Sequence, residues 1–499
     1  MKYMKKFMAL LAVLTLALTV AVPAFAETTT PKTYTITIKN GTGTYAAYQI
    51  FKGDLHEKTL SNIEWGDNVT DEGRTKLGNA AENAKTITTE ADAKAFAVKV
   101  AKYLTDPAAG TGTDSITGLA AGYYLIKNTN VGEDEVFTDY ILQVVENVEV
   151  NPKSGKPTLD KQINDDGAWG VVGDNQIGDT VEFRTITTVP IVSGYTHYTY
   201  EIHDVMSAGL TSNVKDNADV TIKVNDKTVL DKTYYTVKVD EANANEFTVT
   251  VDVLKAIKDG KMAEENKLYT YYTGILNENA KVYNDGNQDN KAYLVYSNNP
   301  HDENSKTQTP EKVVYDWTFK MGVNKVDGEN NTPLTDAKFV LSKKKNCDLG
   351  AIGDDGQPTK TENLISLIKN TDGSYTVAPA GYTGTYVMTA GDITIKGLDD
   401  ATEYYLYETK APAGYNRLTD AVKFEITATY DADGAHYNSV TAVVNDVEQS
   451  SLSVEVKNNK GSILPSTGGI GTTIFYVIGG GLMAVAAVLL VTKKRMNSK

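Results

Sequence analysis

The chain has 499 residues, of which 49 are basic and 64 acidic, and its formal net charge at pH 7 is -15. This acidic balance argues against binding to nucleic acid, which needs clustered lysine and arginine side chains. The single cysteine, Cys347, excludes an intrachain disulfide and a zinc site built from several thiolates. The five histidines show no metal-ligand spacing, so we expect neither a metal nor a cofactor.

The first 26 residues are typical of a secretion signal. A start that contains three lysines is followed by an apolar run over residues 7–22. The small residues Ala24 and Ala26 then frame a cleavage site before Glu27. We therefore predict a cleaved signal peptide at residues 1–26.

The mature region is predicted to be mostly β. Segments of alternating apolar and polar residues recur, are rich in Tyr, Thr and Val, and are separated by Gly, Asn and Asp. Such segments are residues 34–38, 181–184, 237–239, 247–251, 424–426 and 452–456. This pattern predicts an all-β fold of tandem Ig-like β-sandwich domains. One helical passage is expected at residues 90–104, where Ala and Lys cluster.

Changes in composition and restarting strand patterns divide the mature chain into three domains. We place the first domain at residues 27–153, the middle domain at residues 154–316 and the third domain at residues 317–461. Residues 462–499 are expected to hold a sorting signal, a transmembrane segment and a basic tail.

The junction between the first two domains contains a candidate acceptor for polymerisation. Residues 148–153 read Val-Glu-Val-Asn-Pro-Lys and are similar to the pilin motif, in which a lysine after proline accepts an acyl group from a sortase. The second valine, the proline and Lys153 match, whereas Asn151 stands where an aromatic residue is usual. The resemblance implies that Lys153 is the acceptor, with Lys156 as the nearest alternative.

Two domains open with a strand that places a lysine on the core face. Side chains alternate faces along a strand, so Lys325 faces inward with Val323, and Asn458 faces inward with Val454 and Val456. Buried polar groups that stay unpaired are costly. Burial also makes a lysine easier to deprotonate, and a neutral amine can attack an asparagine carboxamide and expel ammonia. A buried carboxylic acid can carry the protons.

The middle domain is similar to a CnaA-like pilin module. The matching segments are residues 178–183, 200–206 and 296–300. The resemblance implies an isopeptide bond from Lys161 to Asn298, with Asp204 as the catalytic acid, and Asn299 remains an alternative partner. Residues 285–289 begin with calcium-loop spacing but lack the later glycine and glutamate, so we expect a turn there.

The third domain contains the most specific motif. Residues 404–415 read Tyr-Tyr-Leu-Tyr-Glu-Thr-Lys-Ala-Pro-Ala-Gly-Tyr and closely resemble the E-box of Gram-positive pilins and the CnaB-type domain of collagen adhesins. Glu408 shares the parity of Leu406, so it is expected to face the core. The resemblance implies that Glu408 catalyses a bond between Lys325 and Asn458. Asn459 remains an alternative, because a shift of one residue in strand phase exchanges the two.

The C-terminus has three parts in a fixed order. Leu464, Pro465, Ser466, Thr467 and Gly468 form a pentapeptide that resembles the sorting signal of sortase substrates. An apolar stretch over residues 474–491 follows, long enough to cross a bilayer, and a basic tail then marks the cytoplasmic side. The resemblance implies that a sortase cysteine attacks the carbonyl of Thr467, releases the chain from Gly468 onward and passes the acyl group to an amine.

These features identify the chain as resembling a Gram-positive sortase-assembled major (backbone) pilin. The expected role is structural, without enzymatic turnover: a shaft subunit linked through Thr467 to Lys153 of the next copy. Expected partners are a pilus-specific class C-type sortase, identical subunits, ancillary pilins, and peptidoglycan reached through a housekeeping sortase. We expect the chain to be secreted to the cell wall and the precursor to be held briefly in the membrane.

The alternative interpretation is a binding protein. A sortase-anchored adhesin, or an ancillary tip or base pilin, would carry the same sorting signal and would recognise a host-surface ligand. The acceptor lysine distinguishes the two, because a shaft subunit needs one and a tip subunit does not.

Overall fold

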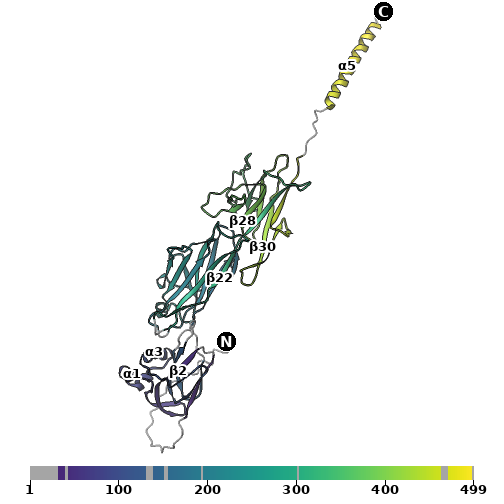
Figure 1. Cartoon of the computed structure of the whole chain (residues 1–499). Coiled ribbons are helices and arrows are strands. Elements are labelled where there is room, and N and C mark those ends of the chain that lie inside the picture. The colour runs from purple at the N-terminus through teal and green to yellow at the C-terminus, as the bar shows by residue number, and fades with distance from the viewer. Residues whose placement is uncertain are drawn as a thin grey trace, which may run out of the picture.

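The computed structural model describes residues 32–39, 43–130, 139–150, 156–192, 195–299, 303–461 and 470–496. Strands account for 46% of the structure and helices for 14%, which confirms the mainly β architecture expected from sequence. Figure 1 shows three strand-rich bodies in an elongated row, with the C-terminal helix standing apart from them. The predicted signal peptide lies outside the described residues.

The first domain combines two sheets with short helices. Its strands are β1 (Tyr34–Ile38), β2 (Thr44–His56), β3 (Thr59–Trp65), β4 (Gly110–Gly112), β5 (Ser115–Leu119), β6 (Gly122–Asn130), β7 (Asp139–Val144) and β8 (Val148–Val150). Its helices are α1 (Asp71–Leu77), α2 (Ala80–Thr86), α3 (Glu90–Val100) and the 3-10 turn η2 (Ala101–Tyr103). One sheet has the order β5-β1-β8 and the other β3-β2-β6-β7, with β4 added to β2.

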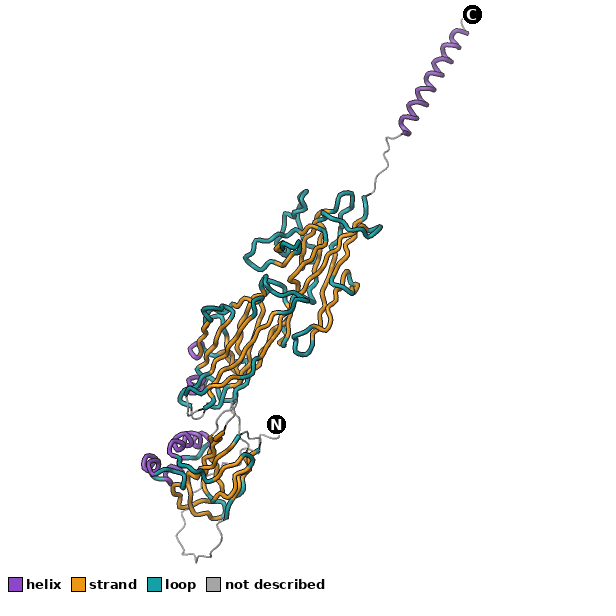
Figure 2. The backbone as a smooth tube through the Cα atoms, viewed as in Figure 1, coloured by secondary structure: helices purple, strands orange, loops and turns teal. Residues whose placement is uncertain are grey.

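The helices of the first domain gather on one side of it (Figure 2). Helix α3 lies within the predicted helical passage. Helices α1 and α2 were not predicted, and each is only seven residues long. Both begin at a capping side chain: Thr70 accepts a hydrogen bond from the Gly73 amide, and Asn79 accepts one from the Glu82 amide. These helices cover a second small core around Phe51.

The middle domain is a two-sheet sandwich. Its strands are β9 (Leu159–Asp165), β10 (Ala168–Gly170), β11 (Val172–Asp174), β12 (Thr180–Thr188), β13 (Tyr200–Met206), β14 (Leu210–Ser212), β15 (Thr221–Val224), β16 (Thr228–Val229), β17 (Tyr235–Val239), β18 (Glu246–Val251), β19 (Lys267–Leu276), β20 (Gln288–Ser297), β21 (Lys306–Gln308) and β22 (Lys312–Trp317). It also contains the turn η3 (Lys232–Tyr234) and the helix α4 (Val253–Lys258). One sheet has the order β10-β9-β12-β19-β15-β16, with β14 on β19, and the other β11-β22-β20-β13-β18-β17, with β21 on β20.

The third domain is a second sandwich that follows after Thr318 alone. Its strands are β23 (Phe319–Asp327), β24 (Lys338–Ser342), β25 (Leu367–Lys369), β26 (Tyr375–Val377), β27 (Met388–Thr389), β28 (Asp392–Leu398), β29 (Tyr404–Lys410), β30 (Val422–Tyr430), β31 (Tyr437–Val444), β32 (Val447–Gln449) and β33 (Ser453–Asn458). The sheets have the orders β25-β26-β28-β23-β33 and β27-β24-β29-β30-β31-β32. The first strand, β23, therefore lies parallel to the last, β33.

The middle and third domains share one continuous apolar core. Ile177 and Trp317 of the middle domain are buried in the same cluster as Tyr404 of the third. The β30–β31 hairpin reaches back to the middle domain, where its Gly434 carbonyl accepts a hydrogen bond from Trp317 Nε1 at 3.0 Å. The cores of the first domain are separate from this cluster. The middle and third domains are therefore joined as one packed body.

Carboxyl groups from both domains meet at this junction. Asp174 of the middle domain accepts hydrogen bonds from Tyr430 Oη at 2.8 Å and from the Asp400 amide at 3.3 Å. Burial raises the pKa of Asp399 to about 8 and that of Asp400 to about 9, and the charge of Asp174 contributes to both shifts. Buried Asp316 is nearby, and its pKa is also raised by burial. At neutral pH Asp399 and Asp400 are therefore held largely protonated, which limits the repulsion among the carboxyl groups at this junction.

The C-terminal helix α5 (Ile470–Met496) is apolar and exposed. Its segment Ile474–Met496 has 23 residues and a mean hydropathy of 2.5, so it is long and apolar enough to cross a membrane. Lys493, Lys494 and Arg495 lie in its last turn, as the sequence predicts.

Replacing Asp400 with asparagine should make the joined domains less sensitive to alkaline pH. The protonated carboxyl contributes its full stability below its unfolded pKa of 3.8 and loses that contribution as the pH rises through its folded pKa of about 9. Asparagine does not ionise. Between about pH 6 and about pH 10, the melting temperature of Asp400→Asn should therefore fall less than that of the wild type, by at least about 2 °C. The exposed Asp336→Asn change is the control, and identical pH profiles for Asp400→Asn and the wild type would contradict the assignment.

Candidate functional site

Two lysines stand out because they are buried. Within the described residues, Lys161 and Lys325 are the buried lysines, with 1% and 2% of their surface exposed. An unpaired ammonium group is very costly inside a protein, so each of these amines needs a partner or must lose its proton. Each lies in a sandwich core beside an acidic side chain and an asparagine.

In the third domain, strand pairing brings the predicted residues together. β23 and β33 are parallel neighbours, with Lys325 opposite Val456 and Asp327 opposite Asn458. Lys325 and Asn458 are therefore two positions apart on adjacent strands. Glu408 projects from β29 in the facing sheet and is 5% exposed. The alternation of side chains along each strand thus places all three groups in one interior.

Hydrogen bonds fix the acid against the asparagine. Asn458 Nδ2 donates to Glu408 Oε2 at 2.9 Å and to the Asn416 carbonyl at 2.7 Å. The Leu418 amide donates to the same Glu408 oxygen at 2.7 Å. The second oxygen of Glu408 and the Asn458 carbonyl oxygen are buried without a partner. Buried polar atoms without a partner are uncommon in folded proteins, so these two atoms set the cluster apart from the rest of the core.

The third-domain amine is prepared for deprotonation. Burial lowers the pKa of Lys325 to about 8, although the charge of Glu408 acts in the opposite direction. The amine donates a hydrogen bond to the Val456 carbonyl at 2.8 Å. With this pKa, about a tenth of the amine is neutral near pH 7.

The choice between Asn458 and Asn459 follows from burial. Asn458 is fully buried, whereas Asn459 is exposed to solvent. The register therefore favours Asn458, and the phase argument from sequence is correct at this strand.

In the middle domain, the amine and the acid meet across the sandwich. Lys161 on β9 and Asp204 on β13 come from opposite sheets, and Lys161 Nζ lies 2.5 Å from Asp204 Oδ2. Tyr272 on β19 brings its hydroxyl to 2.5 Å from the same Nζ and also donates to Asp204 Oδ2. Burial lowers the pKa of Lys161 and raises the pKa of Asp204, which favours a neutral amine beside a neutral acid.

The predicted partner of Lys161 needs correction. Asn298 lies just beyond the end of β20, where its Oδ1 accepts a hydrogen bond from Ser305 Oγ at 2.7 Å. Asp204 pairs with Ala292, so Asn298 is six residues further along, roughly 20 Å at the rise of an extended strand. The structure therefore does not bring Asn298 to Lys161. Asn299 is one residue more distant.

Asn290 occupies the place that the prediction gave to Asn298. It pairs with Met206, two positions from the Asp204–Ala292 pair and on the same face. Asn290 is fully buried, and neither its Oδ1 nor its Nδ2 has a hydrogen-bond partner. Burial raises the pKa values of Asp204 and Tyr272, and the nearby Asn290 carboxamide partly offsets both shifts.

The sequence contained a signal for Asn290. Along β20, Asn290 has the same parity as Ala292, Leu294 and Tyr296, and the burial of the strand alternates in that phase. Parity identifies the inward face but does not say which position on that face lies opposite the acid. Only the pairing of β20 with β13 decides between Asn290 and Asn298.

Several predicted residues lie outside the described part of the chain. They are Lys153 and the pentapeptide residues Leu464, Pro465, Ser466, Thr467 and Gly468. The alternative acceptor Lys156 is described and is half-buried. The roles of all these residues stay predictions.

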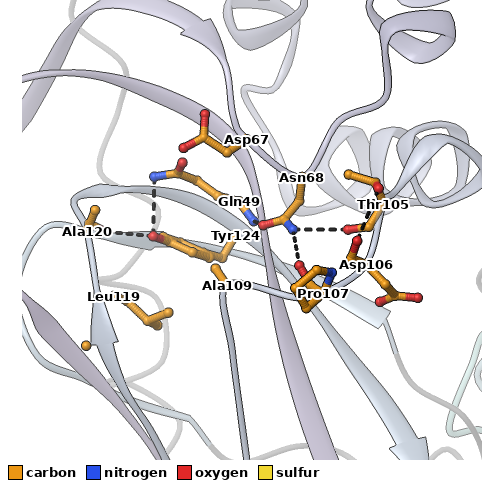
Figure 3. Close-up of a pocket in the computed structure, with 11 residues that line it drawn as sticks. Gln49, Asp67, Asn68, Thr105, Asp106, Pro107, Ala109, Leu119, Ala120 and Tyr124 are labelled. Carbon is orange, nitrogen blue, oxygen red and sulfur yellow. Dashed lines mark hydrogen bonds between the residues drawn. The ribbon is translucent and has the colours of Figure 1, made fainter.

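A polar cavity of about 380 Å³ in the first domain is a separate candidate. Figure 3 shows that the side chains of Asn68, Gln49 and Tyr124 converge in its wall. Asn68 Nδ2 donates hydrogen bonds to the carbonyls of Thr105 and Pro107, at 3.1 and 2.9 Å. Tyr124 Oη donates a hydrogen bond to the Ala120 carbonyl. These contacts tie neighbouring loops together, so we interpret the cavity as part of the scaffold.

Two places in the described residues contain candidate metal ligands. Residues 285–289 run from the end of a turn into the start of β20, and Asn287 Nδ2 donates to the Ala435 carbonyl of the third domain at 3.1 Å. Asp431, Asp433 and His436 bring potential ligand atoms within 4.8 Å of one another. Asp431 and His436 already bond each other at 3.2 Å in the exposed hairpin turn, which accounts for this grouping.

The comparisons with known protein families concern the third domain and the C-terminus. Residues 319–438 match the SpaA prealbumin-like fold domain. Residues 456–498 match the LPXTG cell wall anchor motif.

Similar proteins are surface and fimbrial proteins. The trypsin-resistant surface T6 protein of Streptococcus pyogenes serotype M6 is 28% identical over 266 residues, which cover 45% of this chain and 48% of that protein. Fimbrial subunit type 1 of Actinomyces viscosus is 24% identical over 378 residues, which cover 70% of this chain and 66% of that protein. The chain thus spans less than two thirds of the length of either relative. The solved T6 backbone pilin of Streptococcus pyogenes overlaps with a TM-score of 0.46 at 16% identity, covering 86% of this chain and 98% of that chain.

Proposed function

The chain is a cell-wall-anchored protein similar to Gram-positive pilins, and on that premise we propose that it is the repeating shaft subunit of a covalently assembled pilus. The observation that carries the proposal is the pair of buried lysine clusters in tandem sandwich domains, upstream of an LPXTG anchor. A shaft subunit must transmit tension, and these clusters offer a way to do so without cysteine pairs.

Covalent linkage between subunits would use the sorting signal together with the candidate acceptor lysine. A sortase attacks the Thr467 carbonyl and passes the acyl group to Lys153 of another copy. Repetition gives a head-to-tail contact that does not close, which is the geometry of a fibre. A pilus-specific class C-type sortase would build the shaft, and a housekeeping sortase would join its base to peptidoglycan. Ancillary pilins would occupy the ends.

Within the third domain, Lys325 and Asn458 form an amide bond with Glu408 as the acid. The neutral Lys325 amine attacks the Asn458 carboxamide carbon. Glu408 Oε2 lies 2.9 Å from Asn458 Nδ2, which supports its role in delivering a proton to the departing nitrogen. Ammonia leaves, and the new amide joins the first strand of the domain to the last.

The middle domain forms the equivalent bond between Lys161 and Asn290, with Asp204 as the acid. The neutral pair favoured by the two opposed pKa shifts supports this chemistry. Each bond closes a loop of about 130 residues, which should stabilise its domain by about 5 kcal/mol if the loop-entropy relation for disulfides applies. Amides also resist reductants, which suits a secreted chain with a single cysteine.

Replacing Glu408 with alanine should prevent one of the two internal bonds. Each bond expels one ammonia, about 17 Da, so the wild-type chain should weigh two ammonias less than its amino-acid sequence predicts. Glu408→Ala should weigh only one ammonia less, as measured by intact-mass spectrometry. The half-exposed Glu403→Ala change, on the same segment, should leave both bonds intact. A wild-type mass equal to the unmodified sequence would refute the internal bonds altogether.

Asn290→Ala and Asn298→Ala form a matched pair for the middle domain. Asn290→Ala should weigh only one ammonia less than its own sequence predicts, because the Lys161 amine then has no carboxamide to attack. Asn298→Ala should have the crosslinked mass of the wild type. The opposite pattern would restore the sequence-based assignment and contradict the geometry around Asp204.

Replacing Lys153 with alanine should abolish polymerisation on the cell surface. Without the acceptor amine, the high-mass ladder of boiled wall extracts on a denaturing gel should collapse to single subunits. Lys156→Ala is the matched control and should keep the ladder. A ladder lost only in Lys156→Ala would move the acceptor to that residue, and a ladder kept in both variants would favour an anchored adhesin or an ancillary pilin.

A further inference from the structure

The middle-domain lysine cluster contains a side chain that has no counterpart among the contacts of the third-domain cluster. In the third domain, the amine contacts a backbone carbonyl, and the acid is held by backbone and asparagine donors. In the middle domain, the Tyr272 hydroxyl touches both the reacting amine and the acid. We infer that Tyr272 is a third catalytic residue of the middle domain, an inference that rests on the proposed crosslinking function.

The position of Tyr272 is fixed by its surroundings. The residue is 3% exposed and pairs with Phe183 across β12 and β19. Its ring stacks on Phe183 with 6.0 Å between the ring centroids and packs edge-on against Phe247 at 5.0 Å. These contacts hold the ring from two sides, so the hydroxyl is aimed at Lys161 and Asp204 before any reaction begins.

The hydroxyl remains protonated in this environment. Burial raises the pKa of Tyr272 well above its ordinary value, and the charge of Asp204 raises it further. A neutral phenol can donate one hydrogen bond and accept another. Tyr272 therefore donates to Asp204 Oδ2 while accepting a hydrogen bond from Lys161 Nζ.

This arrangement orients the lone pair of the amine. A neutral amine has two N–H groups and one lone pair. The contacts of Lys161 Nζ with Asp204 Oδ2 and Tyr272 Oη, both 2.5 Å, engage the two N–H groups. The lone pair is then left free for the carboxamide carbon of Asn290.

The same arrangement determines which oxygen of Asp204 carries the proton. Oδ2 accepts hydrogen bonds from both Tyr272 and Lys161, so the acidic proton resides on Oδ1. Asp204 Oδ1 is buried and has no other partner, and the Asn290 side-chain atoms lack partners too. The proton on Oδ1 is thus available to the carboxamide. Without the phenol, the acid could turn its proton onto the amine lone pair, and the nucleophile would be blocked.

The reaction balances without any outside reagent. The Nζ–Cγ bond forms and the Cγ–Nδ2 bond of Asn290 breaks. One Nζ proton passes to Asp204 Oδ2, the Oδ1 proton passes to Nδ2, and ammonia leaves. Asp204 ends neutral with its proton on the other oxygen, and Tyr272 ends unchanged.

Tyr272→Phe tests the inference because it removes only the hydroxyl. Intact-mass spectrometry of the freshly purified chain, repeated during incubation, follows ammonia loss, and proteolytic mapping assigns it to a domain. We expect a mixed population in Tyr272→Phe, with middle-domain bond formation slowed at least tenfold. The third-domain bond should form as in the wild type and serves as an internal control. Tyr271→Phe, whose hydroxyl contacts Asp226, is the matched control and should be fully crosslinked.

The outcomes separate the possible failures. A Tyr272→Phe chain that is fully crosslinked at the first time point would overturn the role of Tyr272. A wild-type middle domain without ammonia loss would overturn the proposed function itself. A structural effect is detected in the bond-free Lys161→Met background, where adding Tyr272→Phe should leave the melting temperature unchanged within about 2 °C. A larger drop there would assign the slow reaction to misfolding and would also overturn the inference.

Discussion

The burial of two amines governs the chemistry of this molecule. Lys161 and Lys325 lie in sandwich interiors where a charged ammonium is strongly disfavoured. Burial shifts the pKa of each lysine downward, and in the middle domain it shifts the pKa of the facing acid upward. A solvated lysine would be an inert surface charge. In the function that we propose, the same side chain inside the core acts as a nucleophile held beside a carboxamide.

Different groups surround the buried amine and its acid in the two domains. In the third domain, Glu408 extends to Asn458, and the Leu418 amide donates to the same carboxylate oxygen. In the middle domain the acid is one methylene shorter, it contacts the amine directly, and the Tyr272 hydroxyl contacts both groups. The proposed reaction would therefore be supported by different acids and different neighbouring groups in the two sandwiches. Each set must be understood from its own contacts.

Strand parity predicts which side chains face the core, but it does not predict how two strands are aligned. Alternation correctly placed Lys325, Glu408 and Asn458 in one interior, although the pairing of β29 with β24 has a register shift next to Glu408. The assignment of Asn298 came from the resemblance. Alternation cannot distinguish Asn298 from Asn290, because it repeats every two residues and does not encode register between strands. The helices α1 and α2 were not predicted because each has only seven residues, too few to show a helical repeat of apolar residues. Each is stabilised by an N-cap side chain and by packing against the domain. The contribution of Tyr272 depends on two partners distant in sequence, which no local pattern contains.

The parallel arrangement of first and last strands has a mechanical consequence. In the third domain the chain enters along β23 and leaves along β33, and these strands run side by side in the same direction. In the first domain β1 and β8 are related in the same way. A pull on the two ends then slides such strands past each other, so every hydrogen bond between them is loaded at once. Under tension, these strands must therefore be sheared apart and cannot be peeled apart one hydrogen bond at a time. A side-chain amide between β23 and β33 would carry the load directly from one strand to the other, so most of the sheet would bear no tension.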